Sequence, residues 1–176
     1  AAGGQLARLD GTAGSGHELA ATLARSLAGR FTVLFTSGDE AHGAGRRLLA
    51  QLQENAKTPG HLAAFPELNH NEIVGWNLPA QQRERFALLI LRGGDESTDG
   101  ALRAETTREL LAAQFGCVHE VHAHGPDRLS RILGLIVFGD LVSAYLAALN
   151  DVDPVPIARI DALKQRLAGR QQKGSR

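Results

Sequence analysis

Short apolar segments that alternate with helical patterns constrain the fold of this chain more than any other feature. Residues 31–36 and 86–91 are almost continuously apolar or β-branched, and residues 118–123 predict another strand. Segments with helical spacing separate them. Strands joined through helices predict βαβ units and a parallel sheet with helices on both faces. Strands that are apolar throughout agree with burial on both faces.

The same patterns divide the chain of 176 residues into one domain with two short ends. Residues 1–14 are small and weakly patterned, which is typical of a linker or a frayed N-terminus. Residues 15–168 form the predicted α/β domain, and residues 169–176 form a basic tail. Within the domain, residues 61–65 predict a further, weaker strand. The last helix is expected to begin near Pro154 and to run to about residue 167.

Composition narrows the class of protein. Lys plus Arg and Asp plus Glu number 19 each, so the chain lacks the positive charge typical of a nucleic-acid-binding protein. No uninterrupted apolar run reaches the ~18 residues that span a membrane, and no leader-like segment opens the sequence. The single cysteine, Cys117, excludes an internal disulfide and a multi-cysteine zinc module. We therefore expect a cytoplasmic protein that binds neither nucleic acid nor membrane.

Methionine is absent from the chain, even at position 1. We expect a processed chain, a part of a longer protein, or a sequence shown without its initiator.

Ligands of open parallel sheets bind beyond the carboxyl ends of the strands. This rule directs attention to the segments after Thr36, Phe65, Leu91 and Ala123. The glycine-rich residues 38–45 follow the first of these strands but match no known phosphate or dinucleotide motif. A simple strand-to-helix turn is therefore favoured there over a ligand loop.

Two other patterns carry little weight. Residues 11–16 have the glycine spacing of a phosphate loop, but His17 stands where lysine is needed. His119, His122 and His124 suggest a metal site, yet no second cluster supplies the remaining ligands. We interpret them as histidines at the end of a strand and expect no metal.

Two polar segments suggest acid–base chemistry. Residues 65–76 place Glu67, Asn69, His70, Asn71 and Glu72 directly before an apolar pair and the only tryptophan. Residues 53–57 place an acid, Glu54, near the end of a mostly apolar helix. Together they suggest a proton-transferring pair, Glu54 with His70, acting on a small polar substrate. Capping and helix-end solvation are the alternative.

These segments resemble a known family. Gln-Glu-Asn-Ala-Lys at 53–57 and Pro-Glu-Leu-Asn-His-Asn-Glu-Ile-Val-Gly-Trp at 66–76 are similar to the second half of bacterial and archaeal bifunctional phosphoglucose/phosphomannose isomerases. Residues 139–146 and 153–164 are similar as well, and the matches follow the family's order over about residues 15–168. The resemblance implies a three-layer sugar isomerase (SIS) domain with a parallel, about five-stranded sheet flanked by helices.

The resemblance also implies a reaction. Family members carry two SIS domains, work as homodimers, and interconvert glucose 6-phosphate, fructose 6-phosphate and, we expect, mannose 6-phosphate. Glu54 would be the base that moves a proton between C1 and C2 through a cis-enediolate. His70, which in the family reaches the site of the neighbouring subunit, would assist ring opening. Lys164 would complete that machinery, and no metal or organic cofactor is implied.

One departure from the family bears on activity. The Ser/Thr-rich loop that holds the sugar phosphate lies in the family's first SIS domain, and residues 36–38 are too short to replace it. We therefore expect a chain that corresponds to the second domain and depends on the first, or on a second copy, for turnover. The alternative is a non-catalytic SIS module that binds a sugar phosphate or mediates dimerisation.

Overall fold

The strands of the chain form one fully parallel sheet. The computed structural model describes residues 6–8 and 13–174 and places five strands in the order β1-β5-β4-β2-β3. The bounds are β1 Leu6–Arg8, β2 Phe31–Ser37, β3 Gly60–Ala64, β4 Phe86–Arg92 and β5 Cys117–His122. The predicted α/β class and the five-stranded parallel sheet are confirmed.

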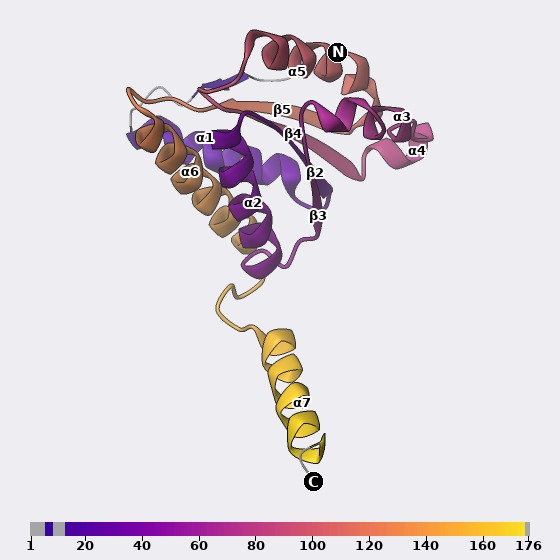
Figure 1. The fold of residues 1–176 in the computed structure, drawn as a ribbon, viewed down its shortest axis with the longest axis vertical. Helices are drawn as coiled ribbons and strands as arrows, with labels where there is room; N and C mark the ends of the chain where they lie inside the picture. Colours follow the sequence, from indigo (N-terminus) through magenta and orange to yellow (C-terminus); the bar gives the residue numbers. More distant parts are fainter. Residues whose placement is uncertain (1–5, 9–12, 175–176) are drawn as a thin grey trace.

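Helices cover both faces of this sheet. α1, α2 and α6 pack on one face, while α5, the short α3 and a 3-10 turn, η1, pack on the other (Figure 1). The bounds are α1 Ala13–Leu27, α2 Asp39–Glu54, η1 Glu67–Asn69, α3 Glu72–Gly75, α4 Ala80–Arg83, α5 Thr98–Leu111, η2 Ala112–Gln114, α6 Arg128–Leu149 and α7 Ala158–Gly174.

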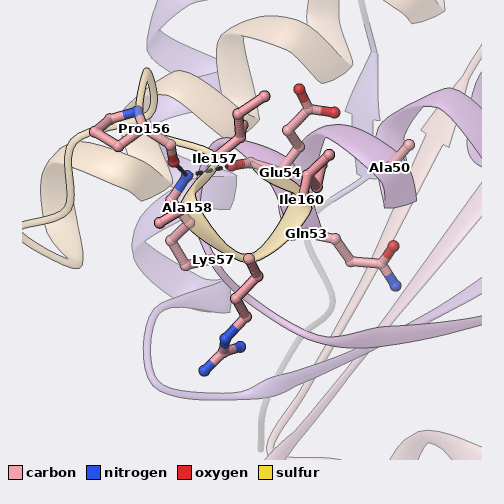
Figure 2. Close-up of a pocket in the computed structure, with 9 residues that line it drawn as sticks. Ala50, Gln53, Glu54, Lys57, Pro156, Ile157, Ala158 and Ile160 are labelled. Atoms are coloured by element: carbon pink, nitrogen blue, oxygen red, sulfur yellow. Dashed lines mark hydrogen bonds between the residues drawn. The ribbon is translucent and has the colours of Figure 1, made fainter. Parts of the chain in front are cut away.

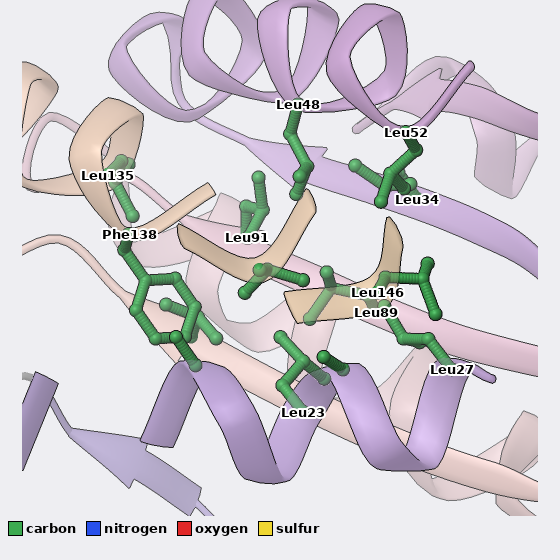
Figure 3. Packing of buried hydrophobic residues seen from close by; sticks show 14 of the residues in the cluster. Leu23, Leu27, Leu34, Leu48, Leu52, Leu89, Leu91, Leu135, Phe138 and Leu146 are labelled. Carbon is green, nitrogen blue, oxygen red and sulfur yellow. The ribbon is translucent and has the colours of Figure 1, made fainter. Parts of the chain in front are cut away.

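The apolar strands explain why both faces are covered. Successive side chains of a strand point to opposite faces, so Leu34 joins the cluster under α1, α2 and α6, whereas Val33 joins the cluster under α5. Figure 3 shows the first cluster, which includes Leu23 of α1, Leu48 of α2 and Leu89 of β4. Each buried leucine of this kind contributes roughly 1.5–3 kcal/mol relative to an exposed one.

Helix α6 corrects one expectation from the sequence. It is long and apolar enough, by length and composition, to cross a membrane. No uninterrupted apolar run was expected from the sequence, because Arg131 and Asp140 interrupt the apolar residues of this helix. In the structure α6 lies between α1 and α2 and buries Phe138, Val142 and Leu146 against them and the sheet. Its apolar character therefore has a structural reason in the core.

The N-terminal segment contains a strand that the sequence did not predict. We assigned residues 1–14 to a linker or frayed end, but Leu6–Arg8 pair in parallel with Glu120–His122 of β5. The remaining residues up to 12 lie outside the described part of the chain. Helix α1 begins at Ala13, so the predicted boundary between residues 14 and 15 is wrong for the described residues.

The last helix also departs from its prediction. It begins at Ala158 instead of near Pro154, because Pro156 disfavours helical conformation in the residue before it. It then continues to Gly174, so most of the predicted basic tail is helical. Figure 1 shows α7 projecting from the body at the end of an extended linker. Ile160, Leu163 and Leu167 are exposed along it.

Candidate functional site

A pocket of about 590 Å³ opens where α2 ends and the linker to α7 passes (Figure 2). One wall comes from the last turns of α2 and the other from the first turn of α7. The lining residues are Ala50, Gln53, Glu54, Lys57, Pro156, Ile157, Ala158, Arg159 and Ile160. Because α2 starts after β2 and α6 starts after β5, both helices end at the amino-terminal edge of the sheet. The pocket lies at that edge.

Glu54 is the last residue of α2 and lines this pocket. The end of a helix carries partial negative charge, which disfavours a carboxylate there. Helix stability therefore does not explain this glutamate. Its side chain is exposed, its carboxylate extends away from the Lys57 amino group, and Ile157 and Ile160 supply apolar surface beside it. A carboxylate on the wall of a half-apolar pocket is suited to proton transfer on a bound polar molecule.

The chain just after Glu54 is tied firmly to the end of α6. Asn55 Nδ2 donates to Ser143 Oγ at 3.2 Å. Asn150 Nδ2 donates in turn to the Ala56 carbonyl and to Thr58 Oγ1, both at 3.0 Å. These bonds fix the end of α2, and with it the backbone that carries Glu54.

His70 lies at the other edge of the sheet. It follows η1 in the connection after β3, and its backbone N–H donates to the Glu67 carbonyl at 2.9 Å. Its ring is exposed and forms no hydrogen bond with any residue that the structure describes. β3 rises by about 3.3 Å per residue, so its five residues separate the two edges by about 13 Å. One copy of the chain therefore does not bring Glu54 and His70 together as a pair.

Most other polar residues of 66–76 have structural partners. Asn69 Nδ2 donates to Thr107 Oγ1 on α5 at 2.7 Å, and Asn71 Oδ1 accepts from the Glu72 N–H at 2.8 Å to cap α3. The Glu72 carboxylate lies 3.0 Å from His61 Nε2 on β3. Trp76 packs between Phe86 and Phe115, with ring centroids at 5.8 and 5.0 Å. Only Asn71 has the capping role of the alternative interpretation, and together these residues hold the loop that presents His70.

Lys164 is not brought to the pocket either. It lies on α7 about one turn beyond Ile160, the last pocket-lining residue of that helix. Its side chain is exposed and has no partner among the described residues. The structure therefore leaves Glu54, His70 and Lys164 at three separate places on one copy.

The carboxyl-terminal edge, where the sequence rule placed a ligand, is occupied by side chains of the chain itself. Buried Glu40 accepts from Arg131 at 2.8 and 2.6 Å and from the Gly94 N–H at 3.0 Å. Asp95 in turn accepts from the Glu40 N–H at 3.2 Å and so caps the start of α2. Gly38, at φ 88°, makes the tight turn into the helix. Gly38 alone forms the strand-to-helix turn, and residues 39–45 already belong to α2.

The pocket that remains at this edge is smaller and acidic. It measures about 270 Å³, and its lining includes Asp39, Asp95, Glu96 and Asp99. Arg103, which also lines it, is paired with Asp99 at 2.6 Å. This lining carries more negative than positive charge, which is unfavourable for a phosphate group in this pocket of a single copy.

Of the histidines on β5, His122 belongs to a second ion-pair cluster. Buried Glu120 contacts Arg92, and His122 Nε2 lies 3.4 Å from Glu120. Burial alone would raise the pKa of Glu120, but hydrogen bonds from His122 and Arg92 lower it overall. His119 points to the other face, where burial and then the charge of Arg30 lower its pKa. Within residues 6–8 and 13–174, no three His, Cys, Asp or Glu side chains gather as a metal site would require.

Sequence reasoning assigned no role to three residues that shape the pocket. Ile157 and Ile160 form its apolar wall, and Lys57 lies beneath it. For Ile157 and Ile160, the signal in the sequence was two isoleucines three positions apart just after Pro156. Lys57 adopts the left-handed conformation, at φ 54°, which no local sequence signal reveals for a lysine.

Comparisons with known proteins connect this geometry to a family. The model of the bacterial phospho-glucose isomerase C-terminal SIS domain matches residues 17–167. The bifunctional phosphoglucose/phosphomannose isomerase of Caldicellulosiruptor bescii is 34% identical over 150 residues, which cover 85% of this chain and 44% of the relative. The enzyme of the same name from Aquifex aeolicus is 33% identical over a region that covers 82% of this chain and 45% of the relative. The chain thus spans less than half the length of these relatives.

The fold is similar to solved structures as well. A glucose-6-phosphate isomerase like protein from Thermus thermophilus superposes with a TM-score of 0.62 at 24% identity, over 77% of this chain and 44% of that one. At that identity the likeness supports the SIS fold.

Proposed function

Because the chain belongs to the family of bacterial phosphoglucose isomerase C-terminal SIS domains, we propose that it contributes the proton-transferring half of a sugar-phosphate isomerase. The substrates are glucose 6-phosphate and fructose 6-phosphate, with mannose 6-phosphate as a further one. Sugar phosphates are charged metabolites, and a lone half-buried thiol fits a reducing compartment. We therefore place the reaction in the cytoplasm.

The observation that carries this proposal is the position of Glu54 on the wall of the 590 Å³ pocket. Glu54 removes the proton from C2 of the open-chain aldose, the electron pair of that bond forms the C1–C2 double bond of a cis-enediolate, and the π pair of the C1 carbonyl moves onto O1. Returning the same proton to C1, while the O2 hydroxyl proton passes to O1 and O2 becomes the carbonyl oxygen, produces the ketose. A base held beside the reacting carbons lowers this barrier, and such proton transfer contributes about 10²–10⁴-fold in rate. The route needs neither metal nor organic cofactor.

Ring opening requires groups that this copy does not place beside Glu54. His70 is exposed at the opposite edge of the sheet, where a second copy can receive it. Lys164 lies on α7 one turn beyond the pocket-lining Ile160 and does not line the pocket itself. Two exposed apolar stripes suit packing against other protein, Leu129, Leu133 and Val137 on α6, and Ile160, Leu163 and Leu167 on α7. We propose a homodimer, a second SIS domain, or both as the partners of these surfaces.

A non-catalytic module is the second candidate. Its support is the separation of Glu54, His70 and Lys164 on one copy. Such a module would bind a sugar phosphate or mediate dimerisation without turnover.

Conversion of fructose 6-phosphate, coupled to oxidation of glucose 6-phosphate, distinguishes the two. We would assay the chain alone and fused to the unmatched part of the Caldicellulosiruptor bescii relative. Glu54→Gln is expected to lower the rate by about 10³-fold or more with folding retained. Glu105→Gln, on the exposed side of α5, is the matched control and should keep the wild-type rate. Saturable binding without turnover in the fusion would instead favour the module.

A further inference from the structure

We propose that Lys57 is a positioning residue that holds the first turn of α7 against Glu54. The inference rests on the proposed function for its catalytic consequence, while its structural part stands on contacts described below. Lys57 belongs to the pocket lining but lies directly after the helix that carries Glu54.

The Lys57 ammonium group joins two segments about 100 residues apart. Its Nζ donates to the backbone carbonyl of Glu54 at 2.7 Å, which is one of the unpaired carbonyls at the end of α2. It also donates to the carbonyl of Pro156 at 2.8 Å and to that of Pro154 at 3.4 Å. One side chain thus ties the end of α2 to the linker that leads into α7 (Figure 2).

These three bonds decide between two roles for the lysine. An ammonium group has three N–H donors and no acceptor. All three point to carbonyl oxygens, so a substrate oxygen could bind Lys57 only by displacing one of them. The geometry therefore favours positioning over direct binding of a sugar phosphate.

Other hydrogen bonds also restrain the segment between α6 and α7. Asn150 is bound to Ala56 and Thr58, and the Val155 N–H donates to Asp153 Oδ1 at 2.9 Å. Among these hydrogen bonds, those of Lys57 reach furthest along the linker, to the carbonyl of Pro156. Without Lys57, residues 154–157 would lose their described side-chain anchor to α2, because the neighbouring bonds stop at Asn150 or stay within the linker.

The consequence concerns the width of the pocket. Ile157 and Ile160 line the pocket beside Glu54, and Ile157 follows Pro156 directly. A clamp on Pro154 and Pro156 therefore sets where this wall stands and where the rest of α7 starts. Misplacement of a catalytic wall by about 1 Å can lower a rate by about 10²-fold.

A distance measurement tests the clamp without any need for activity. Nitroxide labels at Arg46→Cys on α2 and Arg166→Cys on α7, in a Cys117→Ser background, report the α2–α7 distance by pulsed electron resonance. Lys57→Met removes the three donors but keeps a long, unbranched side chain at the same φ, whereas Lys57→Arg keeps donors. We expect Lys57→Met to broaden or shift the distance distribution. Lys57→Arg and the control Arg170→Gln should preserve it. A distribution that Lys57→Met leaves unchanged overturns the proposal.

Kinetics of the fusion protein test the catalytic consequence. Lys57→Met is expected to lower kcat by about 10- to 100-fold with little change in KM, and Lys57→Arg should recover part of kcat. An increase in KM at unchanged kcat would show that Lys57 binds substrate and would overturn the positioning role. If wild-type fusion protein shows no turnover, the proposed function fails, and the distance measurement still decides whether Lys57 is the clamp.

Discussion

At the scale of single residues, Glu40 shows why the carboxyl edge of this sheet is closed. Its carboxylate is fully buried and is held by the two-pronged contact with Arg131 and by the Gly94 N–H. A side chain at Gly94 would clash with Arg131 Nε, so the glycine makes room for the pair. The Arg131 hydrogen bonds hold the pKa of Glu40 below its usual value despite burial.

Glu40→Gln is therefore expected to lower the free energy of unfolding at pH 7 by about 3–5 kcal/mol, because it leaves Arg131 without its counter-charge. A carboxyl group whose folded-state pKa is lowered stabilises the protein above its unfolded pKa, and this stability is lost as pH falls through the folded value. The wild-type protein should lose its advantage over the variant below pH ~4.5. Urea denaturation at pH 7 and at lower pH measures both effects. An equal difference at all pH values would contradict the ion-pair explanation.

At the scale of elements, α6 presents two faces with different tasks. Its buried side, with Phe138, Val142 and Leu146, packs between α1 and α2. Its outer side leaves Leu133 and Val137 about half exposed. A helix that is apolar on both sides is expected where one side meets the core and the other meets further protein.

Two matched truncations distinguish these faces. Leu146→Ala should lower the free energy of unfolding by about 2–5 kcal/mol, since it opens a cavity in the core. Leu133→Ala, the same change on the outer face of the same helix, should cost less than about 1 kcal/mol in the isolated chain. Denaturant titration of dilute protein provides the comparison. Similar costs for the two variants would show that the outer face is already buried in a stable assembly.

The elements also show which parts of the fold were accessible from sequence. The strands that became β2, β4 and β5 were predicted because burial on both faces leaves an apolar signature in the strand itself. β1 has only three residues, and its conformation depends on pairing with β5. A pattern confined to those residues could not reveal a partner more than 100 positions away.

The candidate site was accessible in part for the same reason. Glu54 and His70 stand in recognisable segments, so their chemistry could be predicted. Their separation by the length of β3 could not, because it depends on the direction of α2 relative to the sheet. Lys57 was missed because its partners, Pro154 and Pro156, meet it only in the folded chain.

At the scale of the whole molecule, the two edges of the sheet carry different parts of one proposed reaction. The base lies at the amino-terminal edge and the exposed histidine at the carboxyl-terminal edge, about 13 Å apart along β3. If the proposed reaction takes place beside Glu54, the histidine of that site would come from another copy. In a two-fold dimer each of the two sites would combine Glu54 of one copy with His70 of the other.

Mixing two inactive variants tests this arrangement. Glu54→Gln and His70→Ala fusion proteins are each expected to lose about 10²-fold or more of their activity. After joint refolding, half of the dimers are mixed, and each mixed dimer keeps one site with both groups intact. The mixture should therefore recover about a quarter of the wild-type rate. A mixture of Glu54→Gln with the double variant Glu54→Gln/His70→Ala is the control and should stay inactive. If the first mixture also stays inactive although mixed dimers form, Glu54 and His70 do not meet across two copies, because such dimers contain every group that the shared site requires.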